Sequence, residues 1–160
     1  MESTFVGIVG SRRRATLADR KMVFRLVERL RDHYASRSRL VLVSGGCPTG
    51  ADHFMEEAAQ VYGVETEIHP VDKKGITTKW EFRERAFSRN RVVAERSSIV
   101  FCLVSPDRTG GTENTIDHAV ELKKKIFLVT ETGDIYLSRE DGKTLTCAPQ
   151  ANLLDLSSIG

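Results

Sequence analysis

The sequence predicts an α/β protein with a doubly wound, mainly parallel five-stranded sheet, helices on both faces and a C-terminal β-hairpin. Two observations support this prediction. Five short apolar runs alternate with four longer helix-forming segments, and three of the runs lead directly into glycine-bearing loops. Continuous apolar runs are typical of strands buried on both faces, and their alternation with helices is typical of a parallel sheet.

The N-terminal part of the chain predicts two strands and the helix between them. Phe5 to Val9 is a short apolar run that ends at Gly10 and Ser11. Between Leu17 and Tyr34, apolar residues recur at helical spacing and charged residues lie elsewhere, as in an amphipathic helix. Leu40 to Val43 is a second apolar run and predicts the second strand.

The middle of the chain repeats this order. Ala51 to Tyr62 predicts the second helix, and Val64 to Pro70 alternates as a third strand that is closed by a proline. A polar loop over residues 71–78 precedes Lys79 to Arg96, a long charged segment rich in helix formers. Ile99 to Val104 is the most continuous apolar run, and we expect it to be a central parallel strand.

The last elements follow a third glycine-bearing loop. Glu113 to Lys123 predicts the fourth helix, and Ile126 to Val129 predicts the fifth strand. Beyond them, Asp134 to Leu137 and Lys143 to Cys147 flank an Asp141-Gly142 turn signal, which predicts a two-stranded ribbon. A ribbon of two strands is marginal alone, so we expect it to pack on the core or on a second subunit.

Length and composition suit one globular unit. The 160 residues are 40% hydrophobic and 29% charged. No apolar run approaches the ~20 residues of a membrane span, and the N-terminus lacks the features of a secretory signal, so we expect a cytoplasmic protein. Three separated cysteines without paired metal spacing predict neither a disulfide framework nor a zinc site, and we expect no metal and no cofactor. We expect residues 1–130 to form the binding domain and residues 131–160 the hairpin and tail.

Three glycine-bearing loops point to a ligand. They follow the first, second and fourth strands at residues 10–14, 44–52 and 105–112. In a doubly wound sheet, loops at the carboxyl ends of the strands meet where the strand order reverses, and ligands bind there. A helix N-terminus beyond such a loop offers unpaired N–H groups and the positive end of a dipole, so we expect a phosphate-bearing ligand.

Arginines are concentrated in two places despite a net charge of only +2. Arg12, Arg13 and Arg14 directly follow the first strand, and five more arginines lie in the predicted third helix. Such groups bind phosphates on a small nucleotide or on a nucleic acid strand. A solvated helix face balanced by glutamates is the alternative for most of them, though less so for Arg12.

Four segments, in this order and spacing, resemble the SLOG superfamily. They are VGIVGSR (6–12), VSGGCPTGAD (43–52), Arg89-Asn90 and GGTENTIDHA (110–119). That superfamily includes the LONELY GUY phosphoribohydrolases, the DNA-processing Smf proteins, molybdenum cofactor carriers and the YpsA-related proteins, which the chain resembles most. The resemblance covers about residues 4–130, and the motifs together are more specific for the fold than for the activity.

The resemblance implies a Rossmann-like sheet that binds nucleotides or related phosphates. The loop at the start of the fourth helix would hold the phosphate through backbone N–H groups and a threonine hydroxyl. Related proteins commonly pair through helices, so a homodimer or higher homo-oligomer is expected. The ligand residues are then Gly10, Ser11, Arg12, Gly45, Gly46, Asp52, Asn90, Gly110, Gly111 and Thr112.

The phosphoribohydrolases of this superfamily use an arginine on the third helix and a glutamate in the helix after the phosphate loop. Arg89 matches the arginine, whereas Asn90 stands where a lysine is usual. The glutamate position is taken by Thr115, and two residues along a helix turn a side chain by roughly 200°. Glu113 is the acid nearest the loop, so Glu113 and Arg89 are the catalytic candidates.

Two main functions remain open from the sequence. The first is binding of a nucleotide or nucleotide-derived phosphate ligand, as a sensor or carrier. The second is an N-glycosidase that acts on nucleoside 5'-monophosphates. Single-stranded DNA binding is less favoured because the net charge is near neutral and no aromatic cluster is present. Trp80 is a candidate for stacking on a base, with a place in the core as the alternative.

Overall fold

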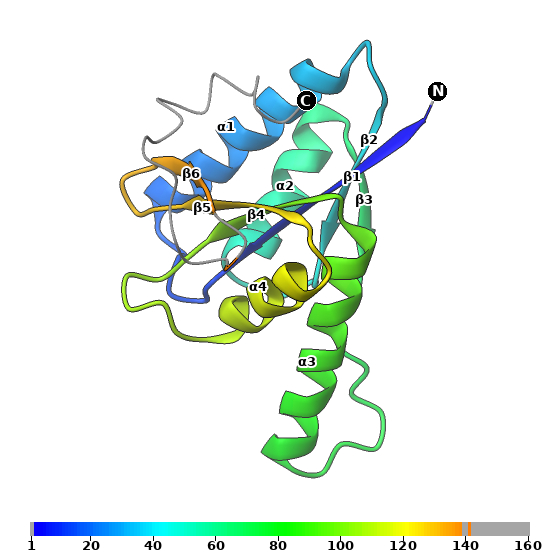
Figure 1. Ribbon diagram of the computed structural model, residues 1–160, viewed down its shortest axis with the longest axis vertical. Helices are drawn as coiled ribbons and strands as arrows, with labels where there is room; N and C mark the ends of the chain where they lie inside the picture. Colours follow the sequence, from blue (N-terminus) through cyan, green and yellow to red (C-terminus); the bar gives the residue numbers. More distant parts are fainter. Residues whose placement is uncertain (1, 139–140, 142–160) are drawn as a thin grey trace.

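A computed structural model of the chain describes residues 2–138 and residue 141, and within them six strands form one sheet (Figure 1). The strand order is β3-β2-β1-β4-β5-β6; the first five strands of the chain are parallel, and β6 is antiparallel to β5. The predicted doubly wound α/β fold is confirmed. In chain order the elements are β1 (Ser3–Gly10), α1 (Leu17–Tyr34), β2 (Arg39–Ser44), α2 (Ala51–Tyr62), β3 (Glu65–Ile68), α3 (Lys79–Arg96), β4 (Ile99–Leu103), α4 (Gly111–Glu121), β5 (Lys125–Val129) and β6 (Ile135–Leu137).

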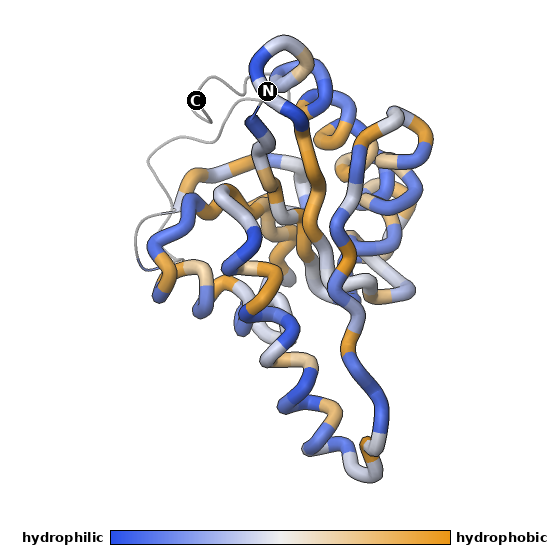
Figure 2. Tube along the Cα trace, turned by 90° about the vertical axis from the view of Figure 1, so that its right-hand side faces the viewer, coloured by the Kyte–Doolittle hydropathy of each residue, from blue (hydrophilic) through white to orange (hydrophobic). Residues whose placement is uncertain are grey.

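Two helices cover each face of the sheet. α1 packs beside α2 on one face, and α3 packs beside α4 on the other (Figure 1). Successive strand residues point to opposite faces, so Val6 and Ile8 join the core beneath α1 and α2, whereas Val9 joins the core beneath α3 and α4. In Figure 2 the apolar strands lie between helices of mixed polarity. The spacing of apolar residues in each segment predicts this arrangement.

The helices α2 and α4 begin differently from α1, although all three follow glycine-bearing loops. α1 starts with a capping box, in which the Thr16 hydroxyl accepts the Asp19 N–H and the Asp19 carboxylate accepts the Thr16 N–H. α2 and α4 follow Gly50 and Gly110, whose φ angles are 77° and 107° and which carry no capping side chain. The turn at Gly110 starts α4 two residues before the predicted Glu113, and it leaves the first amides of α4 without a side-chain cap.

β6 is the first arm of the predicted hairpin. It extends the sheet by pairing with β5, with Ile135 opposite Val129 and Leu137 opposite Phe127. The buried Ile135 side chain explains this position, because it joins the core beneath α1 and α2. The predicted second arm, residues 143–147, lies outside the described residues, and the division of the chain at residue 130 stays a prediction.

The N-terminal half of α3 extends beyond the sheet, as Figure 1 shows. None of residues 79–88 is buried, and the first buried side chain of the helix is that of Asn90. Arg85 fastens the preceding loop to this part of the helix by donating to the backbone carbonyls of Asp72 and Lys74. The part of α3 beyond the sheet therefore forms a wall beside the carboxyl ends of the strands. No helix among the described residues is both long enough and apolar enough to cross a membrane.

Candidate functional site

A cavity of about 480 Å³ lies at the carboxyl ends of β1, β2 and β4, against α3. Its place follows from the topology, because the connection after β1 leads to β2 on one side while β4 lies on the other side. All three predicted loops contribute to its lining, although they are far apart in sequence. The predicted residues that line it are Gly10, Ser11, Arg12, Gly45, Asp52, Arg89, Asn90, Gly110, Gly111 and Thr112.

The N-terminus of α4 forms one wall of the cavity. Gly110, Gly111 and Thr112 all line it, and Thr112 is buried. The first amides of a helix have no acceptor within the helix, and the helix dipole places partial positive charge at the same point. This wall is therefore suited to bind an anion such as a phosphate group.

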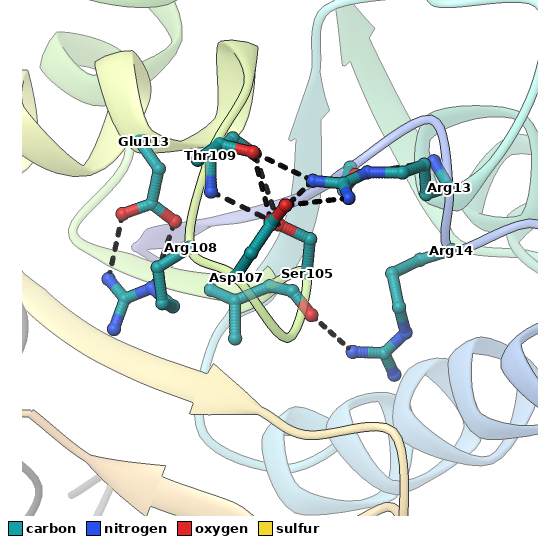
Figure 3. A network of polar contacts seen from close by, with 9 residues as sticks. Arg13, Arg14, Ser105, Asp107, Arg108, Thr109 and Glu113 are labelled. Carbon is teal, nitrogen blue, oxygen red and sulfur yellow. Dashed lines mark hydrogen bonds and ion pairs between the residues drawn. The ribbon is translucent and has the colours of Figure 1, made fainter.

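The three consecutive arginines after β1 have three different environments, and Figure 3 shows those of Arg13 and Arg14. Arg12 is exposed and lines the cavity. Arg13 also lines it, but its guanidinium is paired with Asp107. Arg14 is 1% exposed and points into the protein beneath the loop. The arginine run is thus not one continuous phosphate-binding surface.

Arg13 joins the loop after β1 to the loop after β4. It donates to the two carboxylate oxygens of Asp107 at 2.9 and 2.5 Å and to the Thr109 hydroxyl at 2.8 Å (Figure 3). Ser105 and Thr109 also donate their hydroxyl protons to Asp107. These donors hold the pKa of Asp107 well below its usual range, with the Arg13 hydrogen bond as the largest cause. These contacts hold the loop after β1 against the loop after β4.

Arg14 supports the same loops from the protein interior. Its guanidinium donates to Asp19 at 2.8 Å, to the carbonyls of Val104 and Val129 at 2.9 and 2.8 Å, and to the carbonyl of Thr130 at 2.9 Å. A contact of 3.7 Å to the Met22 sulfur completes the set. The five N–H donors of the arginine therefore have five acceptors. The role of Arg14 is structural, because it ties α1 to the ends of β4 and β5.

Arg89 and Asn90 connect α3 to the loops on both sides of the cavity. Arg89 donates to the Gly45 carbonyl, to the His69 carbonyl at 3.4 Å and to the Asn90 side chain at 3.0 Å. Asn90 in turn donates to the Gly111 carbonyl at 3.3 Å. Burial lowers the pKa of Arg89, and the Asp52 charge acts in the opposite direction. A cation thus stands against the cavity at the point where α3 meets the glycine turn after β2.

Asp52 places a buried carboxylate in the same cavity. It belongs to the first turn of α2, and one of its oxygens accepts the Cys47 N–H at 3.1 Å. Burial raises the pKa of Asp52 to about 6, while the Cys47 hydrogen bond and the Arg89 charge lower it. The carboxyl group therefore changes its charge close to neutral pH, which is typical of functional sites.

This raised pKa predicts a pH dependence of stability. The pKa of Asp52 is about 6 in the folded protein and 3.8 ordinarily, so folding takes up a proton and stability falls as the pH rises from about 4 to 6. A rise of roughly two pKa units is worth about 3 kcal/mol. We expect the Asp52→Asn variant to lack this decrease of the free energy of unfolding between pH 4 and pH 7, as measured by urea unfolding at the two pH values. Parallel pH profiles for the two proteins would contradict the prediction.

Three predicted site residues lie away from the cavity lining. Both carboxylate oxygens of Glu113 accept hydrogen bonds from Arg108, each at 2.9 Å (Figure 3). Trp80 is 66% exposed in the first turn of α3, neither in the core nor at the cavity. Gly46 has a φ of 69°, and an added Cβ there would meet Ile68 at 2.8 Å, so it serves the turn after β2 rather than the lining.

Other residues line the cavity that were not predicted to do so. Thr115 occupies the position of the hydrolase glutamate, and it lines the cavity while Glu113 does not. This agrees with the rotation of a helix over two residues. Phe87, Cys47 and Thr109 also line the cavity. The spacing of Phe87, one helical turn before Asn90, is the signal that would have identified it. In the described part of the chain, no group of three or more His, Cys, Asp or Glu side chains is placed to hold a metal ion.

The structure is similar to solved structures of molybdenum cofactor proteins. One is the molybdenum cofactor binding protein from Rippkaea orientalis, with TM-score 0.60 and 18% identity, covering 81% of this chain and 78% of that chain. Another is the molybdenum cofactor carrier protein MCP from Chlamydomonas reinhardtii, with TM-score 0.57 and 18% identity over 81% of this chain and 78% of that chain.

A third similar structure is that of TM1055, a structural genomics target, with TM-score 0.53 and 15% identity over 79% of this chain and 72% of that chain. The sequence matches no protein-family model, and no curated protein matches it. Structural similarity at 15–18% sequence identity establishes the fold alone. The chain therefore has the Rossmann-like fold that its resemblance to the SLOG superfamily predicted.

Proposed function

We propose that this protein binds a nucleotide or nucleotide-derived phosphate ligand in the cavity, as a sensor or carrier. The observation that supports this proposal best is the meeting of three sequence-distant loops around one cavity with a helix N-terminus in its wall. The cavity volume of about 480 Å³ is in the usual range of small-molecule sites. Two proteins of similar structure are named as a molybdenum cofactor binding protein and a molybdenum cofactor carrier protein. These names favour a small-molecule ligand for this protein.

The chemistry of the cavity fits a phosphate group at the start of α4. Backbone amides of Gly111 and Thr112 and the Thr112 hydroxyl offer donors, and Arg12 adds a cation from the loop after β1. Arg89 adds a second cation from α3. Donors from three different segments surround one volume, which is the arrangement that a phosphate with several acceptor oxygens needs.

Isothermal titration calorimetry with AMP, GMP, UMP, CMP and ribose 5-phosphate tests the proposal. We expect saturable binding of at least one of these, weakened roughly 5- to 10-fold by Arg12→Met because a charged donor is lost. Arg25→Met is the matched control, since Arg25 is an exposed arginine of α1 that does not line the cavity. No heat from any of these compounds at millimolar concentration would refute the proposal.

An N-glycosidase on nucleoside 5'-monophosphates is the second candidate. It is favoured by one observation: Arg89 and a carboxylate of raised pKa, Asp52, line the same cavity. Such a reaction needs a carboxylate that orients water or stabilises an oxocarbenium-like sugar. Chromatography for released base tests it, with Asp52→Asn and Glu113→Gln compared. Loss of base release in one variant alone identifies the carboxylate, and intact substrate with wild-type protein rejects the activity.

Two partner predictions from the sequence stay predictions. A homodimer or higher homo-oligomer is checked by light scattering. Binding of single-stranded nucleic acid remains the less favoured expectation, and a salt-dependent gel shift checks it.

A further inference from the structure

The cavity has an aromatic wall as well as a polar one. Among the described residues, Phe87 is the one aromatic residue that lines the cavity, and it is contributed by α3. Ala86 and Val93 of the same helix line the cavity too. The glycine-bearing loops and the start of α4 form the other walls, and their side chains include those of Arg12, Asp52 and Thr112. A ligand in this cavity therefore contacts apolar side chains of α3 as well as the donors of Arg89, Asn90 and the loops.

The position of Phe87 along α3 determines how far it lies from the N-terminus of α4. Asn90 touches the first residue of α4 through the Gly111 carbonyl. Phe87 precedes Asn90 by three residues, which is about 4.5 Å along the helix axis, in the direction in which α3 extends beyond the sheet. The backbone of Phe87 thus lies nearly one helical turn farther from the sheet than that of Asn90, which contacts the start of α4.

Arg83 contacts the ring of Phe87. The Arg83 guanidinium carbon lies 5.0 Å from the centre of the Phe87 ring, within the range of a cation–π contact. Phe87 lines the cavity, whereas Arg83 does not. Because a phenylalanine side chain has only two rotatable bonds, its ring loses little freedom when a second planar group stacks on it.

We propose that Phe87 stacks on the base of a nucleoside 5'-phosphate whose phosphate group binds at the N-terminus of α4. This inference rests on the proposed function and narrows it, because it makes the base a recognised part of the ligand. Stacking between an aromatic side chain and a base is sequence-tolerant, so Phe87 distinguishes nucleotides from sugar phosphates rather than one base from another. It also takes over the role that the sequence suggested for Trp80, which lies about 10 Å earlier along α3.

Calorimetry with AMP, UMP and ribose 5-phosphate tests this assignment, because ribose 5-phosphate keeps the sugar and phosphate and lacks the base. We expect wild-type protein to bind at least one of the two nucleotides roughly 5- to 100-fold more tightly than ribose 5-phosphate, the range that stacking supplies. Phe87→Leu is expected to remove this preference while leaving the affinity for ribose 5-phosphate unchanged, and Phe87→Trp to keep it.

Phe82→Leu is the matched control, since Phe82 lies on the same helix outside the cavity lining. Equal binding of nucleotides and ribose 5-phosphate by the wild-type protein overturns the stacking assignment and leaves the phosphate site standing. Equal weakening of all three compounds by Phe87→Leu also overturns it, because the residue then acts only on the shape of the cavity. If no compound binds the wild-type protein, the proposed function falls and the assignment falls with it.

Discussion

Replacement of Arg14 by methionine is expected to lower the free energy of unfolding by about 3–5 kcal/mol, because it leaves the buried Asp19 carboxylate without its cation. The carbonyls of Val104, Val129 and Thr130 lose their side-chain donor as well. Methionine fills much of the same space, so the cost comes from polar groups rather than from a cavity. For a chain of this length we expect the melting temperature to fall by roughly 6–20 °C.

The measurement is urea unfolding followed by circular dichroism, with Arg12→Met as the control. Arg12 is two residues away and exposed, so its replacement is expected to change stability by less than about 0.5 kcal/mol. The stability of Arg14→Lys is expected to lie between those of Arg14→Met and Arg12→Met, because lysine keeps the charge but has fewer donors. Equal stability of Arg14→Met and wild type would show that the Arg14 contacts do not hold the loops.

Replacement of Arg89 by methionine is expected to weaken binding of a nucleoside monophosphate roughly 100-fold. Arg89 is the partly buried cation of the cavity, and truncation of a buried charged group that bonds a ligand commonly costs about 2–5 kcal/mol. The Arg89 hydrogen bond to the Gly45 carbonyl is lost in the same variant, so the glycine turn also loses a fixed point.

Calorimetry with AMP and UMP measures this loss, and Arg85→Met is the matched control. Arg85 lies one helical turn earlier on α3, bonds the loop carbonyls of Asp72 and Lys74, and does not line the cavity. Gly45→Ala gives an independent variant, because its Cβ would lie 2.6 Å from the Arg89 guanidinium and displace it. Unchanged affinity in Arg89→Met would remove Arg89 from the site.

Most of the architecture was predictable from the sequence. The predicted bounds of α1, α2 and α3 agree with the structure, because the apolar spacing and the flanking Thr16, Gly63 and Ser97 mark their ends. The loop convergence was predictable too, since it follows from a parallel sheet with crossover helices. The pairing of β6 with β5 was not, because a short strand contains no signal for which sheet edge it joins.

The roles of individual side chains were less predictable than the fold. Three arginines in a row look alike in a sequence, yet Asp107, which pairs with Arg13, and the three carbonyls that accept from Arg14 lie 90 or more residues away along the chain. Only the three-dimensional course of the loop decides which of them faces Asp107 and which enters the core. Phe87 was overlooked because an aromatic residue on a helix is typical of the core, although its spacing from Asn90 places it on the helix face that lines the cavity.

The central position of β1 has a consequence for synthesis of the protein. β1 lies between β2 and β4, with Val6 opposite both Leu42 and Ile99. The ribosome makes β2 soon after β1, but β4 follows only about 90 residues later. Ribosomes add roughly 5–20 residues per second, so the edge of β1 that pairs with β4 stays unpaired for roughly 5–20 seconds during synthesis. Such an edge is a template for pairing with other chains, so we expect a translation pause before Ile99 to increase aggregation.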